Sequence, residues 1–166
     1  MKLINNYING NEISFSKNKL PVYDPSTGEI IAEVVKSNEE DFQKIIHSSV
    51  QSQKNWSKTT PLKRSRVLSK YKNLIEENIY ELAELVSREH GKTLEDAKAS
   101  ITRGVEVVEF ACGIPYILKG EFSKDVGTDI DSWSFRSPLG VCVGITPFNF
   151  PAMVPMWMYP IAIACG

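Results

Sequence analysis

The sequence is poor in cysteine and has almost no excess charge of either sign. Its 166 residues include three cysteines, an odd number at scattered positions, which does not suit a disulfide framework and fits a reducing compartment such as the cytoplasm. The 19 basic and 20 acidic residues leave a net charge of −1, so nothing electrostatic favours nucleic acid or an anionic membrane as a partner. The first residues lack the apolar core of a signal peptide, and we expect no export.

Two common signatures of ligand binding are absent as well. The chain has no Gly-x-Gly-x-x-Gly fingerprint, so a dinucleotide, if bound, would be held in another way. The two histidines, His47 and His90, lie in helical segments without metal-ligand spacing. We therefore expect no metal site and interpret both histidines as surface or capping residues.

The longest apolar stretch covers residues 138–166, which is long enough to span a membrane. Its prolines would interrupt a membrane helix repeatedly, and an asparagine within it would be an unpaired amide in lipid. These residues are Pro147, Pro151, Pro155, Pro160 and Asn149. We predict instead a strand over residues 139–145, apolar on both faces and buried in a parallel sheet, followed by a helix that begins at Pro151.

Asn149 is the polar residue of the turn between this predicted strand and helix. Open α/β sheets bind ligands at the carboxyl ends of their strands, and an amide N–H there could stabilise a developing oxyanion. A turn asparagine that bonds its own backbone fits the spacing equally well. Thr146 and Phe148 flank the same turn and could line a cofactor groove, although alone they are weak indicators.

Residues 1–36 have the pattern of a β-arm. Asn9-Gly10 is a strong hairpin signal, and extended segments are predicted at residues 20–23 and 29–35 on either side of a turn cluster. We interpret this arm as structural, without chemistry of its own.

Helices follow the arm. A capping box of Ser37 and Glu40 predicts the first helix start, and Thr60-Pro61 predicts the second. The second helical run has a break near Asn78 and ends at Gly91, a predicted C-cap. Thr93, with an aspartate three residues later, predicts a third start.

The last segments complete an α/β pattern. Residues 128–136 alternate as a half-buried strand does. The first 120 residues thus wrap a sheet that begins only at residue 138. Because residues 161–166 are still apolar and a buried strand needs parallel neighbours, we expect this chain to be the front part of a longer protein.

The cysteines give no clear nucleophile. Cys142 and Cys165 lie in apolar runs and are predicted to be core residues, since an unpaired cysteine behaves as a small buried hydrophobe. Cys112 follows a helix and has no histidine beside it in sequence. A reactive thiol would need a base or an electropositive setting.

Arg103 admits two interpretations. The ordinary one is a solvated ion pair with Glu106 or Glu109 on the same helix. The sharper one is a guanidinium that grips a substrate carboxylate. The sequence pattern by itself favours the ion pair.

Several separated motifs resemble the aldehyde dehydrogenases. Residues 138–151, Pro-Leu-Gly-Val-Cys-Val-Gly-Ile-Thr-Pro-Phe-Asn-Phe-Pro, resemble the strand–turn–helix entry to that family's cofactor domain. Residues 89–92 resemble the Glu-x-Gly-Lys that ends its second helix, and residues 22–29 match its N-terminal turn. Two features resemble one branch of this family, the CoA-acylating enzymes that act on malonate and methylmalonate semialdehyde. These features are Phe148, in place of the commoner tryptophan, and the methionine-rich residues 152–158.

The resemblance implies an α/β, aldehyde-dehydrogenase-like fold. Residues 1–137 would form the N-terminal β-arm, the helical segment and an oligomerisation-type strand. Residues 138–166 would be the first strand and helix of an incomplete Rossmann-like NAD-binding domain. It also implies NAD as cofactor, coenzyme A as acyl acceptor, a homotetramer as the full-length form, and acetyl-CoA or propionyl-CoA as product with loss of carbon dioxide.

The resemblance assigns roles to four residues. Asn149 would hold the oxyanion, Arg103 would hold the substrate carboxylate, and Thr146 and Phe148 would contact NAD. None of the three cysteines matches the family's nucleophile, which would lie beyond Gly166, so we expect the chain alone to be inactive.

Two alternatives remain open at this point. The chain could be a truncated, non-catalytic remnant that associates with a partner through its β-arm. It could also belong to a semialdehyde dehydrogenase that releases a free acid rather than an acyl-CoA.

Overall fold

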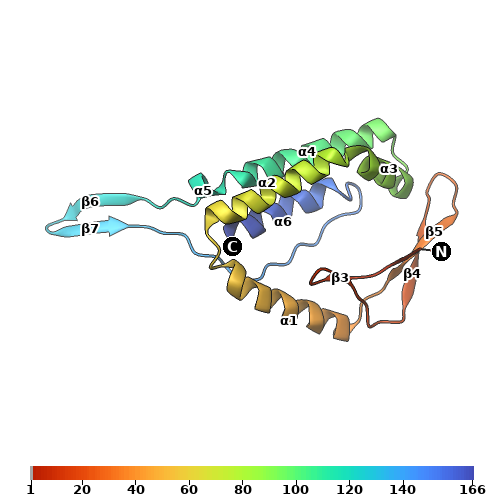
Figure 1. Cartoon of the computed structure of the whole chain (residues 1–166), viewed down its shortest axis with the longest axis horizontal. Helices are drawn as coiled ribbons and strands as arrows, with labels where there is room; N and C mark the ends of the chain where they lie inside the picture. Colours follow the sequence, from red (N-terminus) through yellow and green to blue (C-terminus); the bar gives the residue numbers. More distant parts are fainter. Residues whose placement is uncertain (1) are drawn as a thin grey trace.

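The structure, a computed structural model, describes residues 2–166. It is elongated, with a helical bundle in the middle, a β-arm at one end and a β-hairpin projecting from the other (Figure 1). The helices are α1 (Glu39–Trp56), α2 (Pro61–Glu77), α3 (Ile79–His90), α4 (Leu94–Cys112), α5 (Ile114–Ile117) and α6 (Met153–Cys165). The strands are β1 (Lys2–Ile4), β2 (Tyr7–Ile8), β3 (Asn11–Glu12), β4 (Lys19–Tyr23), β5 (Ile30–Val35), β6 (Phe122–Gly127) and β7 (Ile130–Trp133).

The β-arm confirms the strands predicted for the first 36 residues. β5 lies in the middle of a three-stranded sheet, parallel to β1 and antiparallel to β4. A second pair, β2 and β3, is the predicted hairpin. Asn9 and Gly10 at its tip have φ values of 51° and 80°, the left-handed conformation that tight hairpin turns require.

The first helix starts one residue later than its predicted cap. Asn38, not Ser37, is the N-cap of α1, and its capping partner is Asp41. The Asn38 side chain accepts from the Asp41 N–H at 3.0 Å, and the Asp41 carboxylate accepts from the Asn38 N–H at 3.0 Å. Ser37 is engaged elsewhere, because its hydroxyl donates to the Asn6 side chain at 2.8 Å.

Asp41 also attaches the β-arm to α1. It is fully buried and accepts from the backbone N–H groups of Phe15 (2.8 Å) and Ser16 (3.1 Å) and from Asn6 Nδ2 (3.0 Å). The Phe15 amide, helped by the amides of Asn38 and Ser16 and by Asn6, holds the pKa of the Asp41 carboxyl below its usual value, although burial opposes this shift.

The arm is therefore expected to loosen in acid. A carboxyl whose pKa is lowered on folding stabilises the fold above its unfolded pKa, near 4, and this stabilisation is lost as the pH falls through the lower folded-state pKa. At neutral pH, Asp41→Asn should reduce hydrogen-exchange protection in residues 13–18 by roughly tenfold or more, because an amide cannot accept all the arm's donors. The difference between variant and wild type should shrink below about pH 4.

The control for this experiment is Asp96→Asn, which changes an exposed carboxylate in the first turn of α4. It should leave exchange in residues 13–18 unchanged. A difference between the wild type and Asp41→Asn that persisted undiminished into strong acid would contradict the assignment.

The bundle confirms the predicted helices. Thr60 and Thr93 cap α2 and α4 with their side chains, Asn78 separates α2 from α3, and Gly91 ends α3 with a φ of 83°. The core contains buried side chains from four helices: Ile75, Ala83, Val86, Ala97, Ile101, Val105, Val108 and Met156. This core packs α6, near the end of the chain, against α2, α3 and α4, which come much earlier in the sequence.

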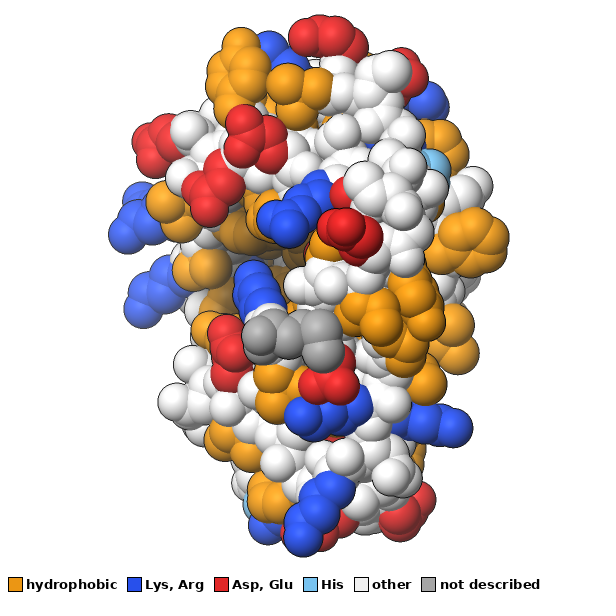
Figure 2. All heavy atoms as spheres, turned by 90° about the vertical axis from the view of Figure 1, so that its right-hand side faces the viewer, with side chains coloured by type: hydrophobic (Ala, Val, Ile, Leu, Met, Phe, Trp, Pro, Cys, Tyr) orange, Lys and Arg blue, Asp and Glu red, His pale blue; other side chains and the backbone are white. Residues whose placement is uncertain are grey.

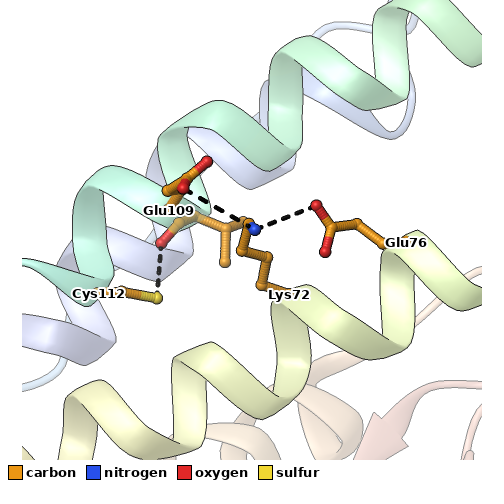
Figure 3. Close-up of polar contacts among 5 residues, drawn as sticks. Lys72, Glu76, Glu109 and Cys112 are labelled. Atoms are coloured by element: carbon orange, nitrogen blue, oxygen red, sulfur yellow. Dashed lines mark hydrogen bonds and ion pairs between the residues drawn. The ribbon is translucent and has the colours of Figure 1, made fainter.

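An ion-pair cluster links α2 to α4 (Figure 3). Lys72 Nζ lies 3.1 Å from Glu76 on its own helix and 3.9 Å from Glu109 on α4. The hydrogen bond with Glu76, followed by the charge of Glu109, raises the pKa of Lys72 above its usual value. Cys112 lies beside this cluster and is half-buried, and its thiol donates to the Val108 carbonyl at 3.3 Å.

The end of α6 is held by side chains from the α1–α2 corner. Arg64 is only 4% exposed and donates to the carbonyl oxygens of Ala164 (2.8 Å) and Thr59 (2.6 Å), with a longer contact to Cys165 (3.5 Å). Trp56 Nε1 donates to the Ile163 carbonyl at 2.7 Å. These donors satisfy carbonyl groups that the last turn of a helix leaves unpaired.

The predicted buried strand over residues 139–145 is wrong for this chain. The segment has no strand pairing, and its side chains are largely exposed, with Leu139 at 98% and Ile145 at 89%. Cys142, predicted to be a core residue, is exposed for the same reason. A strand exists only with a neighbour to pair with, and residues 2–166 place none beside this segment.

The helix after this segment starts later than predicted. Regular α6 begins at Met153 rather than Pro151, although the Val154 N–H already donates to the Phe150 carbonyl at 3.2 Å. Helix ends commonly shift in this way, because the first turn is not yet regular.

The strand predicted at residues 128–136 exists but is shorter and is not half-buried. It is β7, and it pairs antiparallel with β6, a strand that the sequence pattern did not indicate. Every residue of both strands is exposed.

Among residues 2–166, no helix combines the length and hydropathy needed to cross a bilayer.

Candidate functional site

The candidate site is the turn over residues 146–152, which leads into α6. Thr146, Phe148 and Asn149 are all exposed, Phe148 by 87%. The turn occupies the amino-terminal end of α6, and α6 packs along α4. These three predicted site residues are thus accessible to solvent and lie directly before a helix that is packed against α4.

The side-chain amide of Asn149 has no hydrogen-bond partner among the described residues. In the described part of the chain, its amide makes no hydrogen bond to protein, its own backbone included. This does not support the interpretation of Asn149 as a turn asparagine that bonds its own backbone. An exposed amide without an internal partner can donate to a ligand.

Lys92 contacts this turn and was assigned no role from the sequence. Its ammonium donates to the backbone carbonyl of Asn149 at 3.5 Å and lies 4.2 Å from the centroid of the Phe150 ring. The residue lies just after Gly91 and belongs to the Glu-x-Gly-Lys motif. That motif was the one sequence signal that pointed to it, but only the tertiary structure shows what the lysine touches.

Arg103 lies on the exposed side of α4. It takes part in none of the ion pairs of residues 2–166, so the predicted pairing with Glu106 or Glu109 is absent, and Glu109 contacts Lys72 instead. No hydrogen bond joins Arg103 to the Asn149 turn within the same residues. The guanidinium is free to bind a carboxylate.

The neighbour of Arg103 explains how closely α4 and α6 approach. Gly104 is buried, and a Cβ atom there would lie 2.5 Å from Met156 Cε and 3.2 Å from Met156 Cβ. A side chain at this position would require the flexible end of Met156 to move and the helix backbones to separate slightly, so glycine allows the close approach of α4 and α6. The contact fixes the axis of α6 against the helix that carries Arg103.

An apolar groove of about 610 Å³ adjoins the turn. It lies between the second half of α1, the segment over residues 140–146 and one face of α6, with Trp56 and Tyr159 in its wall. Thr146 lines this groove, whereas Phe148, Asn149 and Arg103 do not. Of the four predicted site residues, Thr146 is therefore the one that faces this groove.

The remaining candidate groups form no second site. Cys165 is half-buried, His47 is exposed, and His90 is half-buried with a buried Nδ1 that has no partner. Within residues 2–166, no cluster of histidine, cysteine and acidic side chains is arranged to hold a metal ion.

Comparison with known proteins gives consistent relatives. The chain is 49% identical to the malonate-semialdehyde dehydrogenase of Pseudomonas aeruginosa over 166 residues, which is 100% of this chain and 33% of the relative. It is 45% identical to malonate-semialdehyde dehydrogenase 2 of Bacillus cereus, covering 99% of this chain and 34% of the relative. The chain thus spans about a third of the length of these relatives.

Comparison with solved structures gives relatives of the same kind. The chain matches the crystal structure of a methylmalonate-semialdehyde dehydrogenase from Oceanimonas doudoroffii with a TM-score of 0.97 and 44% identity, over 100% of this chain and 34% of that one. A second match is a Sinorhizobium meliloti protein that is described as a methylmalonate-semialdehyde dehydrogenase and was crystallised with NAD. The TM-score is again 0.97 and the identity 44%, over 100% of this chain and 34% of that one. The α/β architecture is therefore that of the N-terminal part of these enzymes.

The family assignment rests on most of the chain. The sequence model of the aldehyde dehydrogenase family matches residues 13–166, which include all the helices, both edges of the candidate turn and the four predicted site residues. This chain belongs to the aldehyde dehydrogenase family.

Proposed function

We propose that the protein carrying this chain oxidises malonate or methylmalonate semialdehyde with NAD and transfers the acyl group to coenzyme A. The observation that carries the proposal is the similarity, along the whole chain, to malonate-semialdehyde dehydrogenases at 44–49% identity. The products would be acetyl-CoA or propionyl-CoA, with loss of the carboxylate as carbon dioxide. We also propose the cytoplasm as its compartment, which fits the three unpaired cysteines.

The proposed roles follow the geometry of the turn. The uncommitted Asn149 amide would donate to the oxyanion that forms when a nucleophile adds to the aldehyde. The unpaired Arg103 would hold the substrate carboxylate. Thr146, which faces the groove, and the exposed Phe148 would contact NAD, and hydride acceptance is the chemistry that NAD supplies when bound.

The three cysteines of this chain are poor candidates for the nucleophile. None of its three cysteines has a histidine or a carboxylate as a hydrogen-bonded base in the described residues. We therefore propose that the nucleophilic cysteine belongs to sequence outside these 166 residues. In the same view, residues 1–137 form the arm, helical and oligomerisation part, and residues 138–166 begin the NAD-binding domain.

We propose a homotetramer as the assembly, with the β6–β7 hairpin as a surface that pairs with another chain. An isolated two-stranded hairpin is marginally stable in water, and its outer edges offer unpaired backbone groups to another chain. It also exposes large side chains, with Trp133 at 69%. Light scattering that showed a single chain in solution would contradict this assignment.

The proposal is tested on the complete gene product that carries this chain. We expect NADH formation from malonate or methylmalonate semialdehyde to require coenzyme A, with acetyl-CoA or propionyl-CoA detected by mass spectrometry. Turnover that yields free acid without coenzyme A would favour the non-acylating alternative. An inactive product of 166 residues, measured by intact mass, would refute the proposal and favour a non-catalytic remnant.

A further inference from the structure

We propose that Lys92 is the positioning residue of the Asn149 turn: its ammonium fixes the backbone from which the oxyanion-binding amide projects. This inference rests on the proposed function for Asn149 and adds a residue to that site. Lys92 lies 57 residues before the turn, so only the folded chain brings the two together.

Two independent contacts carry the inference. The Lys92 ammonium donates to the Asn149 carbonyl at 3.5 Å and lies 4.2 Å above the ring of Phe150. A cation over an aromatic face is attracted by the ring, and the carbonyl contact is charge-assisted. One side chain thus holds two consecutive residues of a turn that has no regular secondary structure.

Lys92 is itself held in place from the other side. Its carbonyl accepts from Ser87 Oγ at 2.7 Å, and the residue before it, Gly91, is in the left-handed conformation. A Cβ at Gly91 would lie 2.9 Å from Pro25 Cγ, so the β-arm packs directly against this corner. The lysine stem therefore starts from a fixed point where α3 meets the arm.

The surroundings favour a positioning role over a simple surface charge. Lys92 is half-buried, and its ammonium lies against the Phe150 ring rather than in open solvent. The end of the molecule that carries the β-arm is hollowed, with hydrophobic side chains in the floor of the hollow and basic side chains at its rim (Figure 2). No carboxylate forms an ion pair with Lys92 among residues 2–166, so its charge is directed to the turn.

The chain supplies a matched control. Lys98 lies over the ring of Tyr80 at 4.3 Å and donates to its hydroxyl at 3.0 Å. It makes the same kind of contact as Lys92, at nearly the same distance, but away from the Asn149 turn. A general loss of stability from removing a lysine over an aromatic ring should therefore affect both variants alike.

The experiment compares Lys92→Met, Lys92→Arg and Lys98→Met in the complete gene product. Lys92→Met keeps the length of the side chain but removes the donor and charge. It should lower kcat by roughly tenfold, as expected for a small displacement of a reacting group, with little change in the KM for NAD. Hydrogen exchange of the peptide covering residues 146–152 should become faster. Lys92→Arg should restore both properties, and Lys98→Met should change neither.

Two outcomes would overturn the inference. Equal behaviour of Lys92→Met and Lys98→Met in both measurements would show that Lys92 does not hold the turn. Faster exchange without a change in kcat would show that the contact is structural only. A wild-type protein without activity would refute the proposed function, and with it the catalytic meaning of the contact. The exchange data would still show whether Lys92 fixes residues 146–152.

Discussion

Asn149→Ala in the complete gene product should lower kcat by roughly 10²–10³-fold, while the KM for NAD changes little. Removal of a single oxyanion donor has effects of this size in acyl-transfer enzymes, because the amide donates more strongly to the transition state than to the ground state. The structure is consistent with this role, since the Asn149 side chain is exposed and makes no hydrogen bond within the described residues. Little folding energy should therefore be lost with it.

The matched control is Asn73→Ala, which removes an exposed asparagine side chain from α2. It should retain wild-type kcat. Steady-state NADH formation with saturating semialdehyde and coenzyme A measures both variants. If Asn149→Ala kept more than about a third of the wild-type kcat with an unchanged melting temperature, Asn149 would have no place in the oxyanion site.

Arg64→Ala should give the largest loss of stability among single substitutions outside the site. Arg64 is buried, and its guanidinium donates to carbonyls of the α1–α2 corner and of the last turn of α6. Burial lowers the pKa of this guanidinium from its usual value. Arginine keeps its charge in proteins. Hydrogen bonds to a charged group contribute more than neutral ones, so we expect a loss of roughly 2–4 kcal/mol in the local opening free energy of α6.

The loss should appear at the end of α6. Native-state hydrogen exchange of residues 161–166 should become about 30- to 1,000-fold faster in Arg64→Ala, which is the same free energy expressed as a ratio. Arg66→Ala, two residues away but exposed, should leave these amides within a factor of about 3 of wild type. If the exposed and the buried arginine had equal effects, the capping role assigned to Arg64 would be wrong.

The contacts at the two ends of α6 are connected through the helix. Its carboxyl end is held by Arg64 and Trp56, and its first turn by the packing of Met156 against Gly104. The turn that Lys92 contacts comes directly before that first turn. A helix held at both ends and along one side orients the residues that precede it. This explains why distant residues should affect the position of Asn149.

Local sequence signals were sufficient for the helices and the β-arm. The caps at Thr60 and Thr93, the C-cap at Gly91 and the hairpin at Asn9-Gly10 each depend on residues within a few positions of one another. Their physical cause lies in side-chain hydrogen bonds to nearby backbone groups and in the φ values that only some residues adopt easily. Even the error at Ser37 was local, a shift of one residue.

The apolar or alternating composition of a segment was not sufficient to predict whether that segment is buried. The apolar run over residues 139–145 has the side chains of a buried strand, yet it is exposed here because strand formation depends on a partner that the same residues do not encode. β6 was missed and β7 was expected to be half-buried for the related reason that pairing and covering come from other segments.

The sequence by itself determined the family, the order of the long helices and the residue types of the candidate site, because motifs such as the one over residues 138–151 are read along the chain. Tertiary structure alone decided which groups are free and which are engaged. It paired Glu109 with Lys72 and left Arg103 unpaired, buried Asp41 under the β-arm, and placed Lys92 against the Asn149 turn. Two of these contacts join residues that are 26 and 57 positions apart in the sequence, and the Lys72–Glu109 pair joins two helices. The packing of the folded chain brings such residues together, and no local sequence pattern specifies that packing.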